Sequence, residues 1–418
     1  MSQKQKEAVD LVEKGDNIFI TGAAGTGKSH ILRYLKKKYD YLHLTASTGI
    51  SAINIGGQTL HSWAGLGLGN LPITEILKIL FSARGVRTRK KLIMAKMLAI
   101  DEISMIPSYI FDLLNNILKI VRQNDSPFGG LQIILLGDFL QLPPVERENK
   151  EESKFCFESE SWQEANIKYI ELNDTFRQKE EKLITLLNNV RFGRLTGDDI
   201  KMLDSCKNKI DDNILPMDPI ILGTHNYQIE KINSEKLIKL KTETKTYTAK
   251  FSGDEKKIDF LKRNCIAKEE LIIKINSQVM MLKNTYSEDG IMNGSIGNVV
   301  AFGESGFPIV KFSNGKEIEI SPAKWTIERF DEEIGEVVIE AEMLQIPLLL
   351  AWAITVHKSQ GMTLEKVKCS LSKSFTEGQV YVALSRVKTL DGLFLDNFNI
   401  DGIMANEKVI EFYKKNIL

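Results

Sequence analysis

Four short predicted strands, most of them rich in apolar residues and separated by stretches with helical periodicity, dominate the first third of the chain. The strands are predicted at residues 18–20, 42–45, 97–100 and 131–136. Continuous apolar runs of this length are typical of buried parallel strands, and a 3.6-residue apolar period between them favours helices. Residues 2–14 precede the first run and are predicted to be a helix with Ser2 as its N-cap. The N-terminal part is therefore expected to be an α/β unit.

The pattern of apolar and polar positions changes twice further along the chain. A second α/β unit begins near Lys179 and contains a predicted strand at residues 219–222. From about residue 241 to 340 the chain is rich in short strands and turns, with a hairpin signal at Asn314 and Gly315. The α/β pattern then resumes. We predict domains at residues 1–178, at residues 179–240 together with 341–418, and a small β-barrel at residues 241–340 inserted into the second unit.

The residues after the first apolar run match a phosphate-binding P-loop at every fixed position. Residues 22–29 read GAAGTGKS, between a predicted strand and a predicted helix. Glycines let the backbone approach phosphate oxygens, and successive N–H groups at a helix N-terminus attract an anion. Lys28 is predicted to reach the β- and γ-phosphates and Ser29 to bind Mg²⁺. A chance glycine-rich turn is the alternative. The nucleotide-binding residues expected here are Gly22, Ala24, Gly25, Thr26, Gly27, Lys28 and Ser29.

Further candidates for ATP hydrolysis follow the later strands. Asp101 is predicted to hold Mg²⁺ through water, and Glu102 to orient or deprotonate the attacking water. An Asp-Glu pair after a strand is common, so this assignment depends on the P-loop upstream. Gln141, in the loop GDFLQLPPV, is a candidate γ-phosphate sensor.

Two arginines are candidates for stabilising negative charge on the γ-phosphate during its transfer. Arg177 follows a predicted strand at residues 169–172, and Arg386 lies near the end of a predicted helix at residues 381–387. The alternatives are a surface salt bridge for Arg177 and a solvated helical position for Arg386.

Polar residues that could contact a second ligand occur at three places. Residues 45–49, TASTG, end the second predicted strand, where ligands bind in open α/β sheets, although an ordinary turn explains them equally well. His61 and Trp63 could stack on bases, although burial is the more common fate of a tryptophan. Leu66 and Leu68 are expected to be exposed on a protruding element. Hydroxyl and basic groups in ITVHKSQGMT could contact phosphodiester oxygens.

Composition narrows the class of protein without defining its ligand. The chain has 418 residues, 55 Lys+Arg and 55 Asp+Glu, for a net charge of +0. This balance argues against general polyanion binding but allows a local basic channel. The four cysteines form no C-x-x-C pair, so neither a disulfide framework nor a zinc site is expected. The longest apolar run, residues 346–356, is too short to span a bilayer, and no signal peptide is evident, so a cytoplasmic protein is expected.

Together these motifs resemble the Pif-type (petite integration frequency) superfamily 1B DNA helicases. The matching stretches are GAAGTGKS, TASTGISA, GGQTLHSWAG, IDEIS, PFGGLQIILLGDFLQLPPV, TFRQ, GTHN, ITVHKSQGMT and YVALSRV. With the residue that corresponds to Gln5, they run from residue 5 to 387 and cover nearly the whole chain. Residues 125–130 look like the signature that separates this family from RecD-type relatives.

The resemblance implies two RecA-like P-loop domains with ATP between them. It also implies a small wedge element, 1B, around residues 62–76, and an SH3-like β-barrel, 2B, at residues 241–340. Gln5 would read adenine, and Gly361 and Arg386 would join the nucleotide site. The residues implied in DNA binding are Thr45, Ser47, Thr48, Gly49, His61, Phe139, Pro143, Thr224, Asn226, Thr355, His357, Lys358 and Ser359.

The implied activity is ATP-dependent 5′-to-3′ translocation on single-stranded DNA with unwinding of tailed or forked duplexes. The resemblance also implies action on G-quadruplexes, roles in replication, repair, recombination or telomere maintenance, and a monomer that is nucleoid-associated if the source is bacterial. A DNA-dependent ATPase switch and a single-strand-binding module remain alternatives, as does a RecD-like helicase. The two arginine motifs and HKSQG favour a motor, and strand displacement separates a helicase from the first two alternatives.

Overall fold

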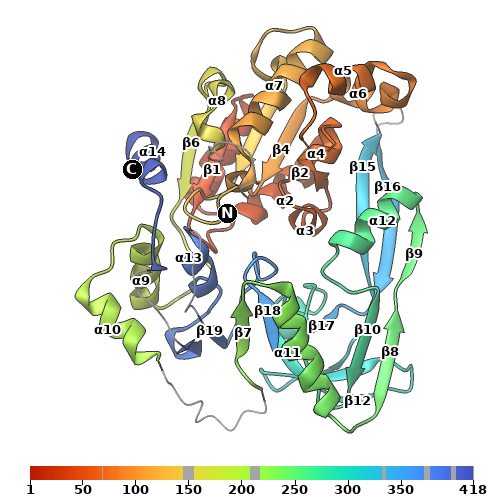
Figure 1. Cartoon of the computed structure of the whole chain (residues 1–418), viewed down its shortest axis with the longest axis vertical. Helices are drawn as coiled ribbons and strands as arrows, with labels where there is room; N and C mark the ends of the chain where they lie inside the picture. The colour runs from red at the N-terminus through yellow and green to blue at the C-terminus, as the bar shows by residue number, and fades with distance from the viewer. Residues whose placement is uncertain are drawn as a thin grey trace. The chain divides into compact units, whose positions relative to one another are not determined.

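Two compact units make up the chain in the computed structural model (Figure 1). The structure describes residues 1–67, 69–144, 155–207, 217–331, 336–370, 377–396 and 402–417. Unit 1 comprises Met1–Thr175, Thr326–Ala341 and Asn406–Leu418, and unit 2 comprises Phe176–Trp325 and Glu342–Ala405. The chain therefore passes between the units several times.

Unit 1 is built on a six-stranded sheet in the order β3-β2-β4-β5-β1-β6, with every pair parallel. Its strands are β1 (Ile18–Gly22), β2 (Leu42–Ala46), β3 (Gln58–Thr59), β4 (Met97–Asp101), β5 (Gln132–Leu136) and β6 (Lys168–Leu172). All residues of β1, β2 and β4 are buried. Strands buried on both faces need continuous apolar runs, which explains why the four predicted strands are all present.

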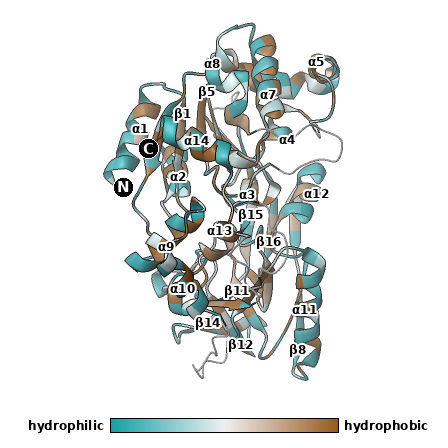
Figure 2. Ribbon diagram, turned by 60° about the vertical axis from the view of Figure 1, so that its left-hand side comes forward, coloured by the Kyte–Doolittle hydropathy of each residue, from teal (hydrophilic) through white to brown (hydrophobic). Residues whose placement is uncertain are grey.

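Helices and short 3₁₀ turns complete unit 1. The helices are α1 (Gln3–Glu13), α2 (Lys28–Lys38), α3 (Gly49–Asn54), α4 (Leu60–Ala64), α5 (Ile73–Phe81), α6 (Val86–Met94), α7 (Ser108–Arg122), α8 (Glu160–Glu164) and α14 (Glu407–Asn416). The 3₁₀ turns are η1 (Ala83–Gly85), η2 (Ile103–Met105), η3 (Pro127–Gly130) and η4 (Cys156–Glu158). Many of the helices carry both polar and apolar segments (Figure 2). Ser2 caps α1 as predicted, in a capping box with Gln5.

Helix α14 belongs to unit 1, which corrects the assignment of the last residues to the second α/β unit. Asn406–Leu418 cluster with unit 1. The Phe412 ring stacks on that of Phe157, with centroids 4.3 Å apart, and Tyr413 is completely buried. The apolar face of this helix is therefore part of the core of the N-terminal unit.

Two side chains of the predicted protruding element, Leu66 and Trp63, lie in the core of unit 1. Leu66 is 0% exposed, so the prediction of an exposed Leu66 is wrong, and Leu68 lies outside the described residues. Trp63 is also 0% exposed and packs 5.6 Å from His43, between ring centroids. The Trp63 ring is thus not available for stacking on a base.

Unit 2 contains a four-stranded parallel sheet in the order β18-β7-β19-β20. Its strands are β7 (Ile220–Gly223), β18 (Ala353–Thr355), β19 (Val367–Ser370) and β20 (Leu393–Asp396). The helices are α9 (Glu181–Arg191), α10 (Gly197–Ser205), α11 (Asn226–Lys239) and α13 (Gln379–Leu384), with the 3₁₀ turn η6 (Leu390–Gly392). This parallel sheet with its helices confirms the predicted α/β fold class of the second unit.

The predicted β-rich insertion is present, and its sheets extend past residue 340. One antiparallel sheet has the order β14-β13-β12-β11-β17, and β8 pairs with β10. These strands are β8 (Thr244–Thr248), β10 (Glu270–Lys274), β11 (Gln278–Met281), β12 (Ile296–Phe302), β13 (Pro308–Phe312), β14 (Glu317–Glu319) and β17 (Leu348–Leu350), with helix α12 (Glu255–Asn264) and turn η5 (Ser287–Asp289). Asn314 and Gly315 form the predicted hairpin turn between β13 and β14.

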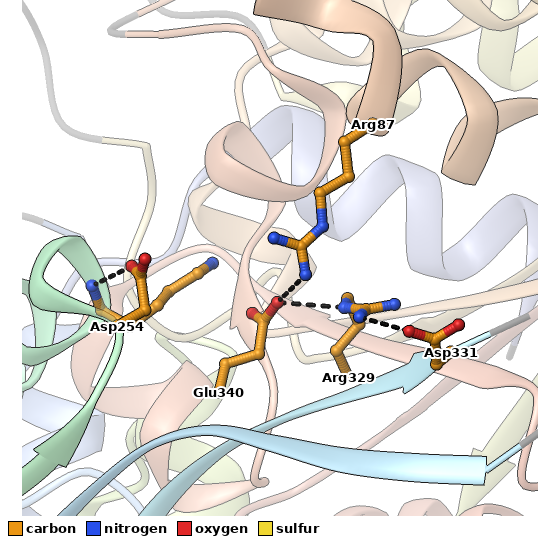
Figure 3. Close-up of polar contacts among 6 residues, drawn as sticks. Arg87, Asp254, Arg329, Asp331 and Glu340 are labelled. Atoms are coloured by element: carbon orange, nitrogen blue, oxygen red, sulfur yellow. Dashed lines mark hydrogen bonds and ion pairs between the residues drawn. The ribbon is translucent and has the colours of Figure 1, made fainter. Parts of the chain in front are cut away.

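A three-stranded sheet in the order β15-β16-β9 joins β9 (Lys250–Gly253), β15 (Ala323–Asp331) and β16 (Glu336–Gln345). The part of β15 and β16 that belongs to unit 1 carries an ion-pair network (Figure 3). Glu340 binds Arg87 of α6 at 2.9 Å and Arg329 at 3.0 Å, and Arg329 also binds Asp331 at 2.6 Å. The ends of these strands therefore pack with unit 1.

The family-like signature at residues 125–130 has a structural explanation. Phe128 and Gly129 adopt left-handed backbone conformations with φ of 53° and 62°, and both are buried. Asn115 accepts a hydrogen bond from the Phe128 N–H at 2.6 Å, and the Gly129 carbonyl accepts one from Arg122 Nε at 2.7 Å. A Cβ on Gly129 would lie 2.6 Å from the Leu118 carbonyl oxygen. Only glycine fits this close approach to α7.

Gly129→Ala should destabilise unit 1 more than Gly15→Ala. Gly15 also has a positive φ, 85°, but no atom lies within 4 Å of a Cβ built there. In both variants the free energy of unfolding should fall by about 1 kcal/mol, because alanine is strained in a left-handed backbone conformation. In Gly129→Ala it should fall by about 1–3 kcal/mol more, because the added methyl group collides with the backbone of α7. Urea and thermal unfolding midpoints of the two variants check this, and equal midpoints would contradict the steric explanation.

Candidate nucleotide site and DNA-contact residues

The predicted P-loop connects β1 to α2 in unit 1. Gly22, at the end of β1, has a φ of 143°, and a Cβ there would lie 2.5 Å from the Leu172 carbonyl oxygen. Gly27 is left-handed, with φ 89°, and immediately precedes the first residue of α2. Lys28 Nζ donates to the carbonyls of Gly22 at 2.7 Å and Ala23 at 3.1 Å. The lysine ammonium therefore lies over the loop, at the N-terminus of a helix, where anions bind.

Gln5 is tied to the P-loop by its side chain. Its Nε2 donates to the Thr26 carbonyl at 3.3 Å, while its Oε1 accepts from the Ser2 N–H at 3.0 Å. The side chain is only 2% exposed. Gln5 therefore holds α1 against the loop, and its contact with adenine stays a prediction.

Asp101 and Glu102 stand at the end of β4, in the same unit as the P-loop. Asp101 is buried and accepts a hydrogen bond from the Glu102 N–H at 3.0 Å. Burial raises the pKa of Asp101 to about 6, although that hydrogen bond and the positive charge of Lys28 oppose the rise. Glu102 has a left-handed backbone, with φ 53°, and is partly exposed.

The oxygen donors of unit 1 fit a hard divalent cation. No group of three or more His, Cys, Asp or Glu residues with metal-site geometry exists among the described residues. Mg²⁺ sites in phosphoryl-transfer enzymes use one or two carboxylates and complete their shell with phosphate oxygens and water. One carboxylate from Asp101 and the exposed hydroxyl of Ser29 match that chemistry.

Gln141 lies in a loop that is organised by a residue not selected from the sequence. Its amide nitrogen donates to Asp138 Oδ2 at 3.2 Å, and Asp138 is 1% exposed. Asp138 is the acidic residue of GDFLQLPPV, so the motif contained the signal, but its role as an internal hydrogen-bond acceptor needs the fold. Val145, the last residue of that motif, lies outside the described residues.

The two candidate arginines lie together in unit 2. Arg177 donates to Thr363 Oγ1 at 3.1 Å and to the carbonyls of Ser385 at 3.0 Å and Gly361 at 3.5 Å. Burial, together with the positive charge of Arg386, lowers the pKa of Arg177 to about 9. Three motifs that are distant in sequence, TFRQ, HKSQG and LSRV, therefore meet in one place.

Arg386 is completely buried, which excludes the solvated helical alternative. Its guanidinium donates to the Val382 carbonyl at 2.8 Å and to Ser385 Oγ at 2.9 Å, and it is 1% exposed. Gln178, missed by the sequence reasoning, donates to the Ser385 and Val387 carbonyls at 3.0 and 2.9 Å. Gln178 thus fixes the backbone around Arg386.

The candidate DNA contacts of unit 1 divide into partly exposed and buried side chains. Ser47, Thr48, Gly49, His61 and Pro143 are partly exposed. Thr45 is 0% exposed and donates to the Ala99 carbonyl at 2.8 Å, and Phe139 is 2% exposed, inside an aromatic cluster 5.1 Å from the Phe19 ring. This burial argues against the prediction that the side chains of Thr45 and Phe139 contact DNA directly.

The candidate DNA contacts of unit 2 also divide into exposed and buried side chains. Asn226 and His357 are exposed, and Thr224 and Lys358 are partly exposed. Thr355 is 3% exposed and accepts from the Lys358 N–H at 3.2 Å, and Ser359 is 0% exposed and donates to the Val356 carbonyl at 2.8 Å. The hydroxyls of Thr355 and Ser359 therefore shape this loop and are not placed to contact DNA.

Comparison with known proteins identifies the family. The family model of PIF1-like helicases matches residues 1–197. The ATP-dependent DNA helicase PIF1 of Xenopus laevis is 38% identical over 421 residues, an alignment that covers 99% of this chain and 64% of that protein. The chain thus spans about two thirds or less of the length of such curated relatives.

Solved structures match over the whole chain. Bacteroides sp Pif1 in complex with ADP-AlF4 has a TM-score of 0.88 and 32% sequence identity, covering 99% of this chain and 97% of that one. Bacteroides Pif1 bound to ssDNA has a TM-score of 0.65 and 33% identity, with 99% and 96% covered. Each unit contains a parallel sheet, and the similarity to these structures confirms the RecA-like fold class that the motifs predicted. This chain belongs to the family of PIF1-like helicases.

Proposed function

We propose that this protein is an ATP-dependent DNA helicase that moves 5′ to 3′ along single-stranded DNA. The observation that carries the proposal is the P-loop of unit 1, in which Lys28 lies over the loop and within electrostatic reach of the buried Asp101. A phosphate-binding loop with an acidic strand end nearby is the core of an NTP-hydrolysing site. Family membership supports DNA as the second substrate.

Each residue of the nucleotide site has an assigned task in this proposal. Lys28 and the loop N–H groups would hold the β- and γ-phosphates, and Ser29 and Asp101 would hold Mg²⁺, which neutralises phosphate charge when bound. Glu102 would orient the attacking water, and Gln141 would sense the γ-phosphate. Arg177 and Arg386 of unit 2 would supply positive charge to the transition state.

The partly exposed polar residues would bind the DNA backbone. Ser47 Oγ is buried and has no hydrogen-bond partner among the described residues, which supports an external acceptor or donor near Thr48 and Gly49. His357 and Lys358 would contact phosphates from unit 2 without reading sequence. Bacteroides Pif1, which binds ssDNA, supports the same substrate for this chain.

The finer family properties form part of the proposal. Residues 62–76 would act as the wedge 1B, and residues 241–340 as the SH3-like domain 2B. Substrates would include tailed and forked duplexes and G-quadruplexes, handled by a monomer in the cytoplasm. In the described residues, none of the helices has the length and apolar character needed to cross a membrane.

Lys28→Ala should abolish ATP hydrolysis and leave single-stranded DNA binding measurable, because the ammonium is needed only at the phosphates. Lys37→Ala is the matched control, since Lys37 is exposed at the other end of the same helix. Steady-state ATPase assays with single-stranded DNA check this. Retained turnover in Lys28→Ala would refute the P-loop assignment.

Glu102→Gln should bind ATP but hydrolyse it roughly 10²–10⁴ times more slowly, because an amide cannot act as a general base. Equilibrium binding of a fluorescent ATP analogue and single-turnover hydrolysis separate the two effects. Near-normal turnover would remove Glu102 from its assigned role.

Polarity is tested with two matched duplexes, one with a 5′ single-stranded tail and one with a 3′ tail. We expect ATP-dependent unwinding of only the 5′-tailed duplex. Unwinding of only the 3′-tailed duplex would retain the motor and overturn the polarity. DNA-stimulated ATPase without unwinding of either would indicate a translocase or switch.

A further inference from the structure

A single phenolic hydroxyl joins the P-loop strand to the loop that contains Gln141. Tyr413 is 0% exposed, and its oxygen lies 2.6 Å from Thr21 Oγ1, at the last position before Gly22. The hydroxyl donates to Asp138 Oδ1 at 2.9 Å and accepts from the Phe139 N–H at 3.3 Å. Because a phenol has one proton and donates it to Asp138, the Thr21 hydroxyl must be the donor to Tyr413.

The Asp138 carboxylate organises the loop that follows β5. Its Oδ1 also accepts from the Leu140 N–H at 3.2 Å, and its Oδ2 accepts from Gln141 Nε2 at 3.2 Å. The Asp138 carbonyl accepts from the Gln141 N–H at 2.9 Å. A carboxylate that is 1% exposed requires donors, because burying an ionised group without hydrogen bonds is very costly. Tyr413 supplies one of them from outside the loop.

We propose that Tyr413 is a positioning residue for the γ-phosphate sensor Gln141. This inference rests on the nucleotide-site roles proposed above. Tyr413 holds one oxygen of Asp138, which leaves the other oxygen oriented toward the Gln141 amide. Because the same hydroxyl is bonded to Thr21, the sensor loop keeps a fixed position relative to the P-loop that holds the other phosphates.

Tyr413 comes from α14, at the opposite end of the chain from the P-loop. Thr21 and Tyr413 are 392 residues apart, and α14 begins immediately after the chain leaves unit 2 at Ala405. The hydroxyl therefore belongs to none of the recognised motifs, which end at residue 387.

The ring and the hydroxyl of Tyr413 can be separated experimentally. Tyr413→Phe keeps the ring and removes only the hydroxyl. Tyr169→Phe is the matched control, because Tyr169 belongs to the same aromatic cluster and its hydroxyl binds Trp162 Nε1 at 3.1 Å, away from the sensor loop. Steady-state ATPase with single-stranded DNA, ADP affinity and the thermal midpoint are measured for each.

Tyr413→Phe should lower kcat and raise the KM for ATP, each by about three- to tenfold, since a buried charged acceptor loses a donor. ADP affinity should change by less than about twofold, because ADP lacks the phosphate that Gln141 senses; a merely structural defect would weaken ADP and ATP binding together. Tyr169→Phe should keep normal ATP kinetics. Equal losses for ATP and ADP, or normal ATP kinetics in Tyr413→Phe, would overturn the inference.

A double-mutant cycle with Gln141→Ala tests the connection directly. If Tyr413 acts through Gln141, adding Tyr413→Phe to Gln141→Ala should cause no further loss of kcat. Additive losses would overturn the inference. If Tyr413→Phe does not fold, Asp138→Asn should show the same ATP-specific loss, and normal ATP kinetics in that variant would overturn it.

The same experiment separates failure of this inference from failure of the proposed function. Normal ATP hydrolysis in Gln141→Ala would refute the sensor role and, with it, the inference. A slow Gln141→Ala combined with a normal Tyr413→Phe would refute the inference alone. No hydrolysis by the unaltered protein in the presence of single-stranded DNA would refute the proposed function.

Discussion

The parallel pairing of β4, β5 and β1 is the constraint on which the candidate nucleotide site of unit 1 depends. These three strands are neighbours in the sheet, and their carboxyl ends face the same edge. The P-loop leaves β1, Asp101 ends β4, and the Asp138 loop follows β5. Ligands of open α/β sheets bind outside this edge, where the strand ends and the loops that follow them present polar groups. A one-residue shift of register would turn every buried apolar side chain of these strands to the opposite face.

Each unit contains a cation that is proposed to bind phosphate and that is partnered within its own unit. Lys28 and Arg177 donate mainly to backbone carbonyls, which are neutral acceptors. A phosphate oxygen is a stronger acceptor for a cation because both partners are charged. Arg177 remains charged at neutral pH even with its pKa lowered to about 9. Under the proposed function, a phosphate oxygen would replace a carbonyl as the acceptor, and the carbonyls would hold the side chains in place until then.

The sequence predicted the local elements of the site better than the long-range packing around it. The strand, glycine loop and helix of the P-loop are encoded within residues 18–38, so motif and periodicity were sufficient. The position of α14 was not predictable in this way. An amphipathic pattern shows that a helix has an apolar face, but not which sheet that face covers. The burial of Phe139 was missed for the same reason, because Phe412, one of its neighbours, comes from α14.

The motifs TASTG and ITVHKSQGMT each contain buried residues that fix the path of a loop and other residues that the loop exposes at the surface. Thr45, Thr355 and Ser359 are buried and bonded to backbone of their own unit. Thr48, His357 and Lys358, in the same motifs, reach the surface. A buried hydroxyl can support DNA binding only by fixing the path of its loop. Loss of DNA affinity on replacing a buried hydroxyl would consequently measure the shape of that loop, whereas loss at an exposed position would measure a phosphate contact and its dependence on salt.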